Sequence, residues 1–171
     1  MNIMKEIRIE KVTLNVGAGK DQNKLKKSIK LIKIIAGIEP VKTITQKRIA
    51  GWGLRPGLPI GCKLTLRKAK AKELLGRLLQ AKENKLALSC VDNSGNISFG
   101  IHEYIDIPDA KYDPDIGIMG LQVSITLERP GFRIKKRKIM KRKISKKHRI
   151  TREDAMKFLQ NEFKIKIGEK E

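Results

Sequence analysis

The chain has 171 residues, a net charge of +21, and 40% hydrophobic but only 4% aromatic residues. This length and apolar content suffice for one ordinary domain with a buried core. Such a charge repels itself unless an anionic partner neutralises it, and nucleic acid is the usual partner. An anionic membrane surface is the alternative, but no apolar run approaches the roughly 20 residues of a spanning helix. The first residues also lack the apolar core of a secretory signal, so we expect a cytoplasmic protein.

Charge is distributed unevenly along the chain. Residues 40–72 contain nine positive charges and no acid. Residues 73–128 contain nine acids against four bases, and residues 129–152 contain thirteen bases and no acid. A charge that only served solubility would be mixed, so this separation favours basic surfaces that bind a polyanion.

The first predicted elements are a strand and a helix. Residues 7–16 alternate apolar and polar side chains, with a change of phase near Glu10 and Lys11. This predicts a strand that contains a bulge or begins later. Apolar residues at helical spacing predict a helix over 22–36, with Gly37 as its C-cap.

The next elements surround a basic loop. β-Branched residues predict a strand over 41–45, and clean alternation predicts a returning strand over 61–67. The segment between them is rich in Gly and Pro, which indicates a shaped loop rather than a flexible tail. Four leucines at helical spacing predict a second helix over about 69–82.

The remaining elements follow the acidic part of the chain. Residues 85–91 and 96–101 flank a turn at 92–95, which predicts a β-hairpin. Residues 108–120 are predicted to form a long loop, and residues 121–129 alternate as a strand. Thr151 and Asp154 have the spacing of a capping box that begins a C-terminal helix.

These elements predict an α+β fold: a single domain over 1–132, with an antiparallel β-sheet and helices packed on one face. Residues 133–171 are expected to be a basic extension with a short helix, not an independent domain. Its run 133–149 has eleven Lys or Arg in seventeen positions. A nuclear-type address or a solvated tail is the alternative, but we expect an irregular arm that RNA phosphates order. Cys62 and Cys90 are expected to be buried free thiols.

A sheet covered by helices on one side has a second, open face. Strand alternation places hydroxyl, amide and a few cationic side chains on it: Thr13, Asn15, Thr43, Thr45, Lys63, Thr65, Arg67, Gln122, Ser124 and Thr126. Such groups donate hydrogen bonds to phosphates and ribose hydroxyls, although threonine is also a good residue for any solvated strand. Together with the net charge, the pattern favours an RNA-binding face that is nearly free of acids.

No pattern indicates catalysis. Residues 17–20, GAGK, are similar to a phosphate-binding loop, but Leu14 and Asp21 stand where that motif needs Gly and Ser or Thr. His102 and His148 are far apart and no CxxC occurs, so no zinc site is expected. The carboxylates of 103–115 offer no assignable acid–base pair. We therefore expect no enzyme activity and no cofactor.

A family resemblance adds to these predictions. The chain contains, in order, the segments VTLNVGAGK, GIEPVKTIT, RPGLPIGCKLTLR, FGIHEYIDIP, YDPDIGIMG and VSITLERPGFR. With these it closely resembles the archaeal and eukaryotic branch of the ribosomal protein L-five family of the large subunit, from about residue 4 to the basic arm. The resemblance implies the same sheet architecture. It also implies that the protein binds 5S rRNA and anchors it in the central protuberance, beside large-subunit rRNA and other proteins.

The resemblance also implies particular contacts. By motif match, the RNA-contacting residues are Asn15, Thr65 and Arg67, which all fall on the predicted open face. Ile38 replaces a Gln that bacterial members often carry, so that contact is not expected. With neighbours on the face, helix, loop and arm, the expected rRNA-binding residues are Thr13, Asn15, Lys27, Lys42, Thr43, Thr45, Lys47, Arg48, Lys63, Thr65, Arg67, Arg133, Lys135, Lys136 and Arg137.

Two loops resemble further contact regions of the family. The first is similar to the loop that reaches P-site tRNA, and it comprises Arg55, Pro56, Gly57, Leu58 and Pro59. The second is similar to the region that faces a small-subunit head protein of the S-thirteen family across an intersubunit bridge, and it contains Asp109, Asp113 and Asp115. Two alternatives remain: a protein that compacts nucleic acid by charge alone, and an RNA-modifying enzyme.

Overall fold

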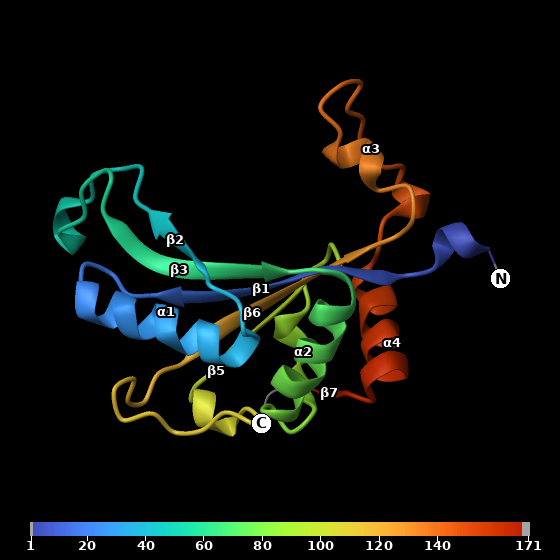
Figure 1. The fold of residues 1–171 in the computed structure, drawn as a ribbon. Helices are drawn as coiled ribbons and strands as arrows, with labels where there is room; N and C mark the ends of the chain where they lie inside the picture. The colour runs from blue at the N-terminus through green and yellow to red at the C-terminus, as the bar shows by residue number, and fades with distance from the viewer. Residues whose placement is uncertain (1, 169–171) are drawn as a thin grey trace.

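Five antiparallel strands in the order β2-β3-β1-β6-β5 form the main sheet of the computed structural model, which describes residues 2–168 (Figure 1). Its strands are β1 (Arg8–Gly17), β2 (Val41–Ile44), β3 (Pro59–Leu66), β5 (Ile97–Ile101) and β6 (Leu121–Glu128). The helices are α1 (Gln22–Ala36), α2 (Lys68–Gln80), α3 (Arg133–Lys136) and α4 (Arg152–Phe163). Helices α1, α2 and α4 lie on the same side of the sheet, so the predicted α+β architecture is confirmed.

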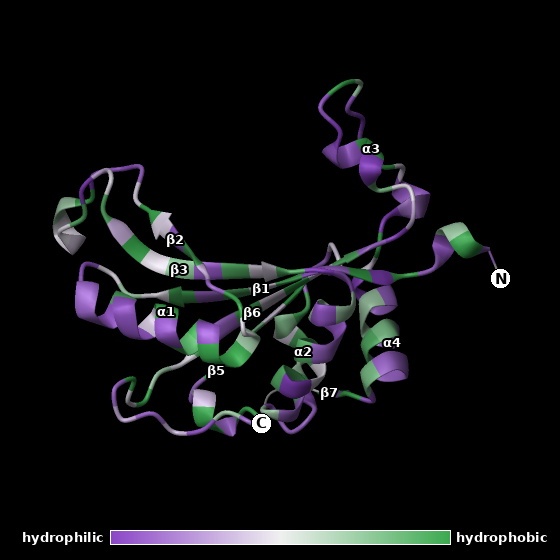
Figure 2. Ribbon diagram, in the orientation of Figure 1, coloured by the Kyte–Doolittle hydropathy of each residue, from purple (hydrophilic) through white to green (hydrophobic). Residues whose placement is uncertain are grey.

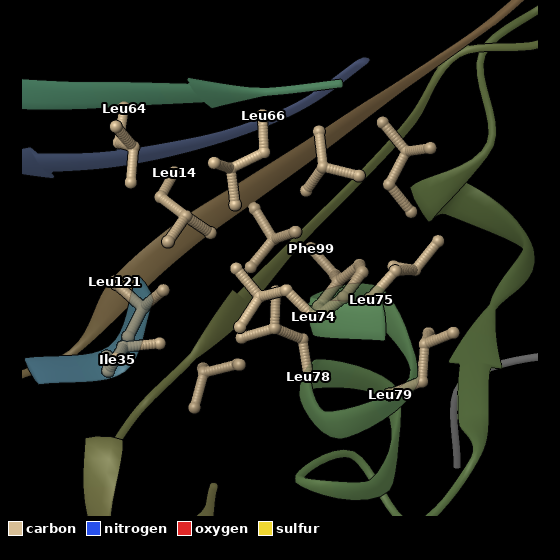
Figure 3. Close-up of a cluster of buried hydrophobic side chains, with 14 of the residues drawn as sticks. Leu14, Ile35, Leu64, Leu66, Leu74, Leu75, Leu78, Leu79, Phe99 and Leu121 are labelled. Atoms are coloured by element: carbon tan, nitrogen blue, oxygen red, sulfur yellow. The ribbon is translucent and has the colours of Figure 1, made fainter. Parts of the chain in front are cut away.

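The core lies between the sheet and these helices. Leu14 and Leu64 point from the sheet toward the leucines of α2 and toward Ile35 of α1 (Figure 3). Ala155 and Leu159 of α4 join the same buried cluster. Burying a leucine stabilises a fold by about 1.5–3 kcal/mol, so these inward positions hold the helices on one face. The other face is left open.

Local signals set the ends and irregularities of several elements. The side chain of Asp21 accepts hydrogen bonds from the first turn of α1, and Gly37 ends that helix at φ 66°. Thr151 and Asp154 form the predicted capping box of α4. The phase change in β1 is a bulge, because the register with β6 shifts between Ile9 and Lys11.

The predicted hairpin over 85–91 and 96–101 is largely wrong. Strand β4 (Lys85–Ala87) pairs in parallel with β7 (Lys166–Gly168), at the C-terminal end of the described chain. The turn itself is present, with a backbone hydrogen bond from Asp92 to Asn96 and one bridge between Val91 and Ile97. The apolar run and the turn after it predicted a strand over 85–91, but they could not identify a partner about 80 residues away.

Two segments project on the side of the sheet that the helices leave uncovered (Figure 1). One is the loop between β2 and β3, and the other is the basic arm that begins with α3. Much of the arm is hydrophilic (Figure 2), and it is irregular apart from α3 and a single 3-10 turn at 146–148, as predicted. The open face therefore lies between two projections.

Both cysteines are free thiols, as predicted. Cys62 is fully buried in β3, and burial raises the pKa of its thiol to about 11. Cys90 is only half-buried, because it lies in a 3-10 turn after β4 and not in a core strand.

Candidate nucleic-acid interface

The open face consists of rows of polar side chains that cross three central strands. Thr13 of β1 lies between Thr65 of β3 and Ser124 of β6. The next row places Asn15 between Lys63 and Gln122. Side chains directly opposite one another in adjacent strands are neighbours on the same face, so these residues form one continuous surface.

Hydrogen bonds within this surface orient some of its groups. The Asn15 amide nitrogen donates to the Gln122 side-chain oxygen at 3.2 Å. At the β5 edge, the hydroxyls of Ser98 and Ser124 are 3.2 Å apart. Thr65 and Lys63 are exposed, and the surface therefore presents donors and acceptors to an external partner. An A-form helix displays ribose hydroxyls on a wide, shallow groove flanked by phosphates, and these are groups with which such donors and acceptors form hydrogen bonds.

Two predicted members of the face have different surroundings. Thr45 lies beyond the end of β2, is 8% exposed, and donates its hydroxyl to the Leu58 carbonyl at 3.0 Å. It therefore stabilises the base of the β2–β3 loop and does not belong to the open face. Thr43 is half-buried opposite Gly61. A Cβ at Gly61 would lie 2.6 Å from the Val16 carbonyl, so glycine permits close packing of the strands here.

One end of the face carries two acids, which the prediction of a nearly acid-free face missed. Glu10 accepts ion pairs from Lys136 at 2.8 Å and Arg67 at 3.4 Å. Glu128 accepts ion pairs from Lys136 and Arg8, each at 2.8 Å. The bulge in β1 turns Glu10 toward this end, a displacement that strand alternation alone does not indicate.

These contacts change the proton affinity of the groups. Burial alone would raise the pKa of Glu128, but hydrogen bonds from Lys136 and Arg8 outweigh it and lower the pKa. Burial alone would lower the pKa of Lys136, and its bonds to Glu10 and Glu128 instead raise it. Both shifts favour the charged forms of Glu128 and Lys136, so this ion pair holds the start of the basic arm at the end of the sheet.

The β2–β3 loop is shaped by its own hydrogen bonds. Gly57 donates its backbone N–H to the Thr45 carbonyl at 2.9 Å, with φ 86°. Ile49 and Leu54 form a bridge that encloses a 3-10 turn, and Trp52 on that turn is 71% exposed. No sequence motif indicated a role for Trp52, although it is the only tryptophan in the chain.

The other predicted site residues of this region are distributed over several surfaces. Arg55, Pro56 and Gly57 are exposed, whereas Leu58 and Pro59 are half-buried. Lys47 and Arg48 are exposed on the same loop, and Lys42 is exposed on the edge strand β2, opposite buried Cys62. Lys27 is exposed on α1, which lies against the covered face, so the sheet separates it from the open face.

Bonds between the segments that precede and follow the arm hold its two ends together. Arg129 pairs with Asp154 of α4 at 2.9 Å, and His148 bonds the Pro130 carbonyl at 2.8 Å. Arg133, Lys135 and Arg137 are exposed on or just after α3.

The acidic loop, residues 108–120 before β6, forms ion pairs with the helices. Lys30 of α1 pairs with Asp113 at 2.7 Å and with Asp115 at 2.8 Å. The bond to Lys30 lowers the pKa of the Asp113 carboxyl. Asp109 is exposed and lies 3.5 Å from Arg77. Each of the three predicted bridge residues therefore lies close to a cation of the protein itself.

No group of three or more His, Cys, Asp or Glu side chains in the described part of the chain could hold a metal ion. No helix within residues 2–168 is long and apolar enough to cross a membrane. A sheet face of hydroxyl and amide groups between two basic projections, on a chain of net charge +21, is typical of a nucleic-acid-binding protein.

Comparison with known proteins identifies the family. A sequence model described as ribosomal protein L5 matches residues 2–55, and one that describes the C-terminus of the same ribosomal family matches residues 59–164. The chain therefore belongs to the ribosomal L5 family.

Curated relatives carry the name large ribosomal subunit protein uL5. The relative from Sulfurisphaera tokodaii is 45% identical over 170 residues, which cover 99% of this chain and 96% of the relative. The relative from Nanoarchaeum equitans is 46% identical over 165 residues, which cover 96% of this chain and 97% of the relative. The family consists of structural ribosomal proteins and not of enzymes, which agrees with the sequence-based expectation. Membership places the chain with rRNA in the large subunit of the cytoplasmic ribosome.

Proposed function

We propose that the open face of the sheet binds 5S rRNA and thereby anchors it in the central protuberance of the large subunit. The observation that carries this proposal is the polar surface that Thr13, Asn15, Lys63, Thr65 and Gln122 form across three strands. Hydroxyl, amide and ammonium groups on a fixed sheet match the phosphates and ribose hydroxyls of folded RNA. A protein that compacts nucleic acid by charge alone would not need this surface.

The proposal is tested with the full chain, 5S rRNA and the double variant Asn15→Ala/Arg67→Ala. Each lost hydrogen bond to a charged or polar RNA group costs roughly 1–3 kcal/mol, so affinity should fall at least tenfold. Removing one cation should also reduce the slope of log affinity against log salt by about one. Unchanged affinity and slope would show that the sheet face is not the interface.

A matched control removes one amide and one cation elsewhere. Asn161→Ala/Lys157→Ala changes exposed side chains of α4, on the covered side of the sheet, and should leave affinity within about twofold. An unrelated RNA duplex of equal length serves as competitor. Equal competition by that duplex would favour a protein that compacts nucleic acid through charge.

The same proposal assigns the β2–β3 loop to P-site tRNA. The loop carries Arg55 and Trp52, its internal hydrogen bonds give it a defined shape, and it projects beyond the sheet (Figure 1). Replacing residues 55–59 by Gly and Ser should weaken tRNA binding to assembled subunits and leave 5S rRNA binding unchanged. Loss of both activities would instead assign the loop to the 5S rRNA interface.

The acidic loop is proposed to face a basic small-subunit head protein of the S-thirteen family. Asp109, Asp113 and Asp115 support this proposal because they bring three carboxylates together in the acidic part of the chain, with Asp109 and Asp115 exposed. Asp109→Asn/Asp115→Asn should weaken subunit association without altering 5S rRNA binding. Glu83→Gln/Glu153→Gln, which changes exposed acids outside the loop, is the matched control.

A further inference from the structure

A cavity of about 650 Å³ lies between the basic arm and the turn before β5, apart from the open face of the sheet. Its least exposed lining side chains are apolar: Phe132 is 8% exposed, Ile150 is 4% exposed, and Ile144 is half-buried. Its remaining wall includes Asn93 and Ser94 from the turn before β5. The cavity thus has an apolar floor and a polar opening.

The opening carries a concentration of positive charge. Five exposed cations line it: Lys135, Lys141, Arg142, Lys143 and Arg149. No acidic side chain lines the cavity, and none of these cations forms an ion pair with a carboxylate of the described chain. Like charges this close repel one another unless an anion neutralises them. Lys136, one position from Lys135, is instead satisfied by Glu10 and Glu128.

The walls of the cavity are fixed by bonds within the arm. The backbone N–H of Arg142 donates to the Ile134 carbonyl at 3.3 Å, and the Arg149 side chain donates to the Ile144 carbonyl at 3.3 Å. The turn over residues 92–95 can approach Ile150 closely because its last residue is Gly95, at φ 74°. A Cβ there would lie 2.6 Å from the Ile150 side chain. The site is therefore partly preformed, which reduces the entropy lost on binding.

We infer that this cavity binds a nucleotide of single-stranded rRNA, with its base on the apolar floor and its flanking phosphates on the five cations. A nucleotide joins an apolar planar ring to negative charge within one unit, which matches the two chemistries of the cavity. The volume lies within the roughly 300–1,000 Å³ of typical ligand sites. The inference does not depend on which RNA occupies the sheet face, because the two surfaces share no residue.

An acidic peptide is the competing occupant. It would neutralise the cations, but its carboxylates would leave the floor formed by Phe132, Ile144 and Ile150 unfilled. The chain is a constituent of a large ribosomal subunit, where RNA is the abundant polyanion. Charge complementarity together with the apolar floor thus favours RNA.

The first test compares two probes on the unmodified full chain. One is a short fluorescent oligouridylate, and the other is the same oligomer with abasic positions, which keeps the phosphates and removes the bases. Base stacking contributes roughly 1–3 kcal/mol per base, which corresponds to about five- to 150-fold weaker binding of the abasic oligomer. Equal binding of the two probes would overturn the inference.

The second test uses variants of equal charge. Arg142→Gln/Lys143→Gln removes two cations of the cavity, and Lys146→Gln/Lys147→Gln removes two exposed cations of the same arm outside it. The first pair should weaken oligouridylate binding about tenfold, and the second by no more than about threefold. Equal weakening would show that only net charge matters and would overturn the site.

Photochemical cross-linking locates the base. Oligomers with 4-thiouridine should cross-link to peptides that contain Phe132 or Ile144, in the unmodified chain and in Asn15→Ala/Arg67→Ala alike. Cross-links confined to the sheet strands would contradict the inference. So would an acidic peptide that displaces the oligomer at a lower concentration than unlabelled oligouridylate, because it would identify a protein partner. Loss of 5S rRNA binding in the sheet variant with the cross-link retained separates this site from the proposed function.

Discussion

The ion-pair network at the end of the sheet supports a prediction about stability, which the substitution Glu128→Gln tests. The Glu128 side chain is 15% exposed and accepts bonds from Arg8 and Lys136, each at 2.8 Å. A hydrogen bond to a charged group contributes about 1.5–3 kcal/mol when buried. Arg8 and Lys136 are 62% and 41% exposed, so solvent screening reduces each contribution to about 0.5–1 kcal/mol. The free energy of unfolding should therefore fall by about 1–2 kcal/mol at neutral pH.

The pH dependence makes this prediction specific. The pKa of Glu128 is lowered in the folded protein from its ordinary value of 4.5. The stabilisation is thus fully present above that ordinary value and is lost as the pH falls through the lowered pKa. Urea unfolding of wild type and Glu128→Gln should differ by a constant amount from neutral pH to about pH 5, and the difference should disappear under more acidic conditions.

The control substitution is Glu103→Gln, which removes an exposed acid that forms no ion pair within the described chain. It should change the free energy of unfolding by less than about 0.5 kcal/mol. Equal stability of Glu128→Gln and wild type at neutral pH would refute the reasoning. A difference that persists below the lowered pKa would refute it as well, because the charge would not be its source.

Three further predictions follow from single side chains. Thr151→Ala removes the capping box of α4 and should lower the free energy of unfolding by about 1 kcal/mol, which urea denaturation measures and Thr151→Ser should restore. Burial raises the pKa of the Cys62 thiol to about 11. At about pH 8 a thiol reagent should therefore modify Cys90 in the native protein and reach Cys62 only after denaturation. Two rapid modifications of the native protein would contradict this. Trp52 is the only tryptophan and is 71% exposed, so acrylamide should quench its fluorescence readily. tRNA should protect it, and protection by 5S rRNA alone would count against the assignment of the loop.

Elements with strong local signals were predicted almost to the residue. The helix expected over 22–36 is α1 (Gln22–Ala36), and the strand expected over 121–129 is β6 (Leu121–Glu128). Caps and side-chain periodicity involve residues within a few positions of one another, so one sequence contains them. The polar rows of the open face were also predicted, because alternation in a strand assigns each side chain to a face.

Contacts between distant segments were not predictable in this way. Alternation placed Thr45 on the open face, but the chain turns after Ile44 and directs its hydroxyl to the Leu58 carbonyl. The partner of β4 is β7, and the cation partners of Glu128 are Arg8 and Lys136. These pairs depend on how several elements pack, and no local pattern encodes that packing.

By itself, the sequence determined the element types, the inward and outward positions of most strands, the basic character of the partner surfaces, and the family. Only the tertiary structure decided the strand order, the acids at the end of the sheet, and the union of residues 93–94 with residues 132–150 around one cavity. The reason is physical. Charge and periodicity are properties of neighbouring residues, whereas a binding surface depends on which distant residues the folded core brings together.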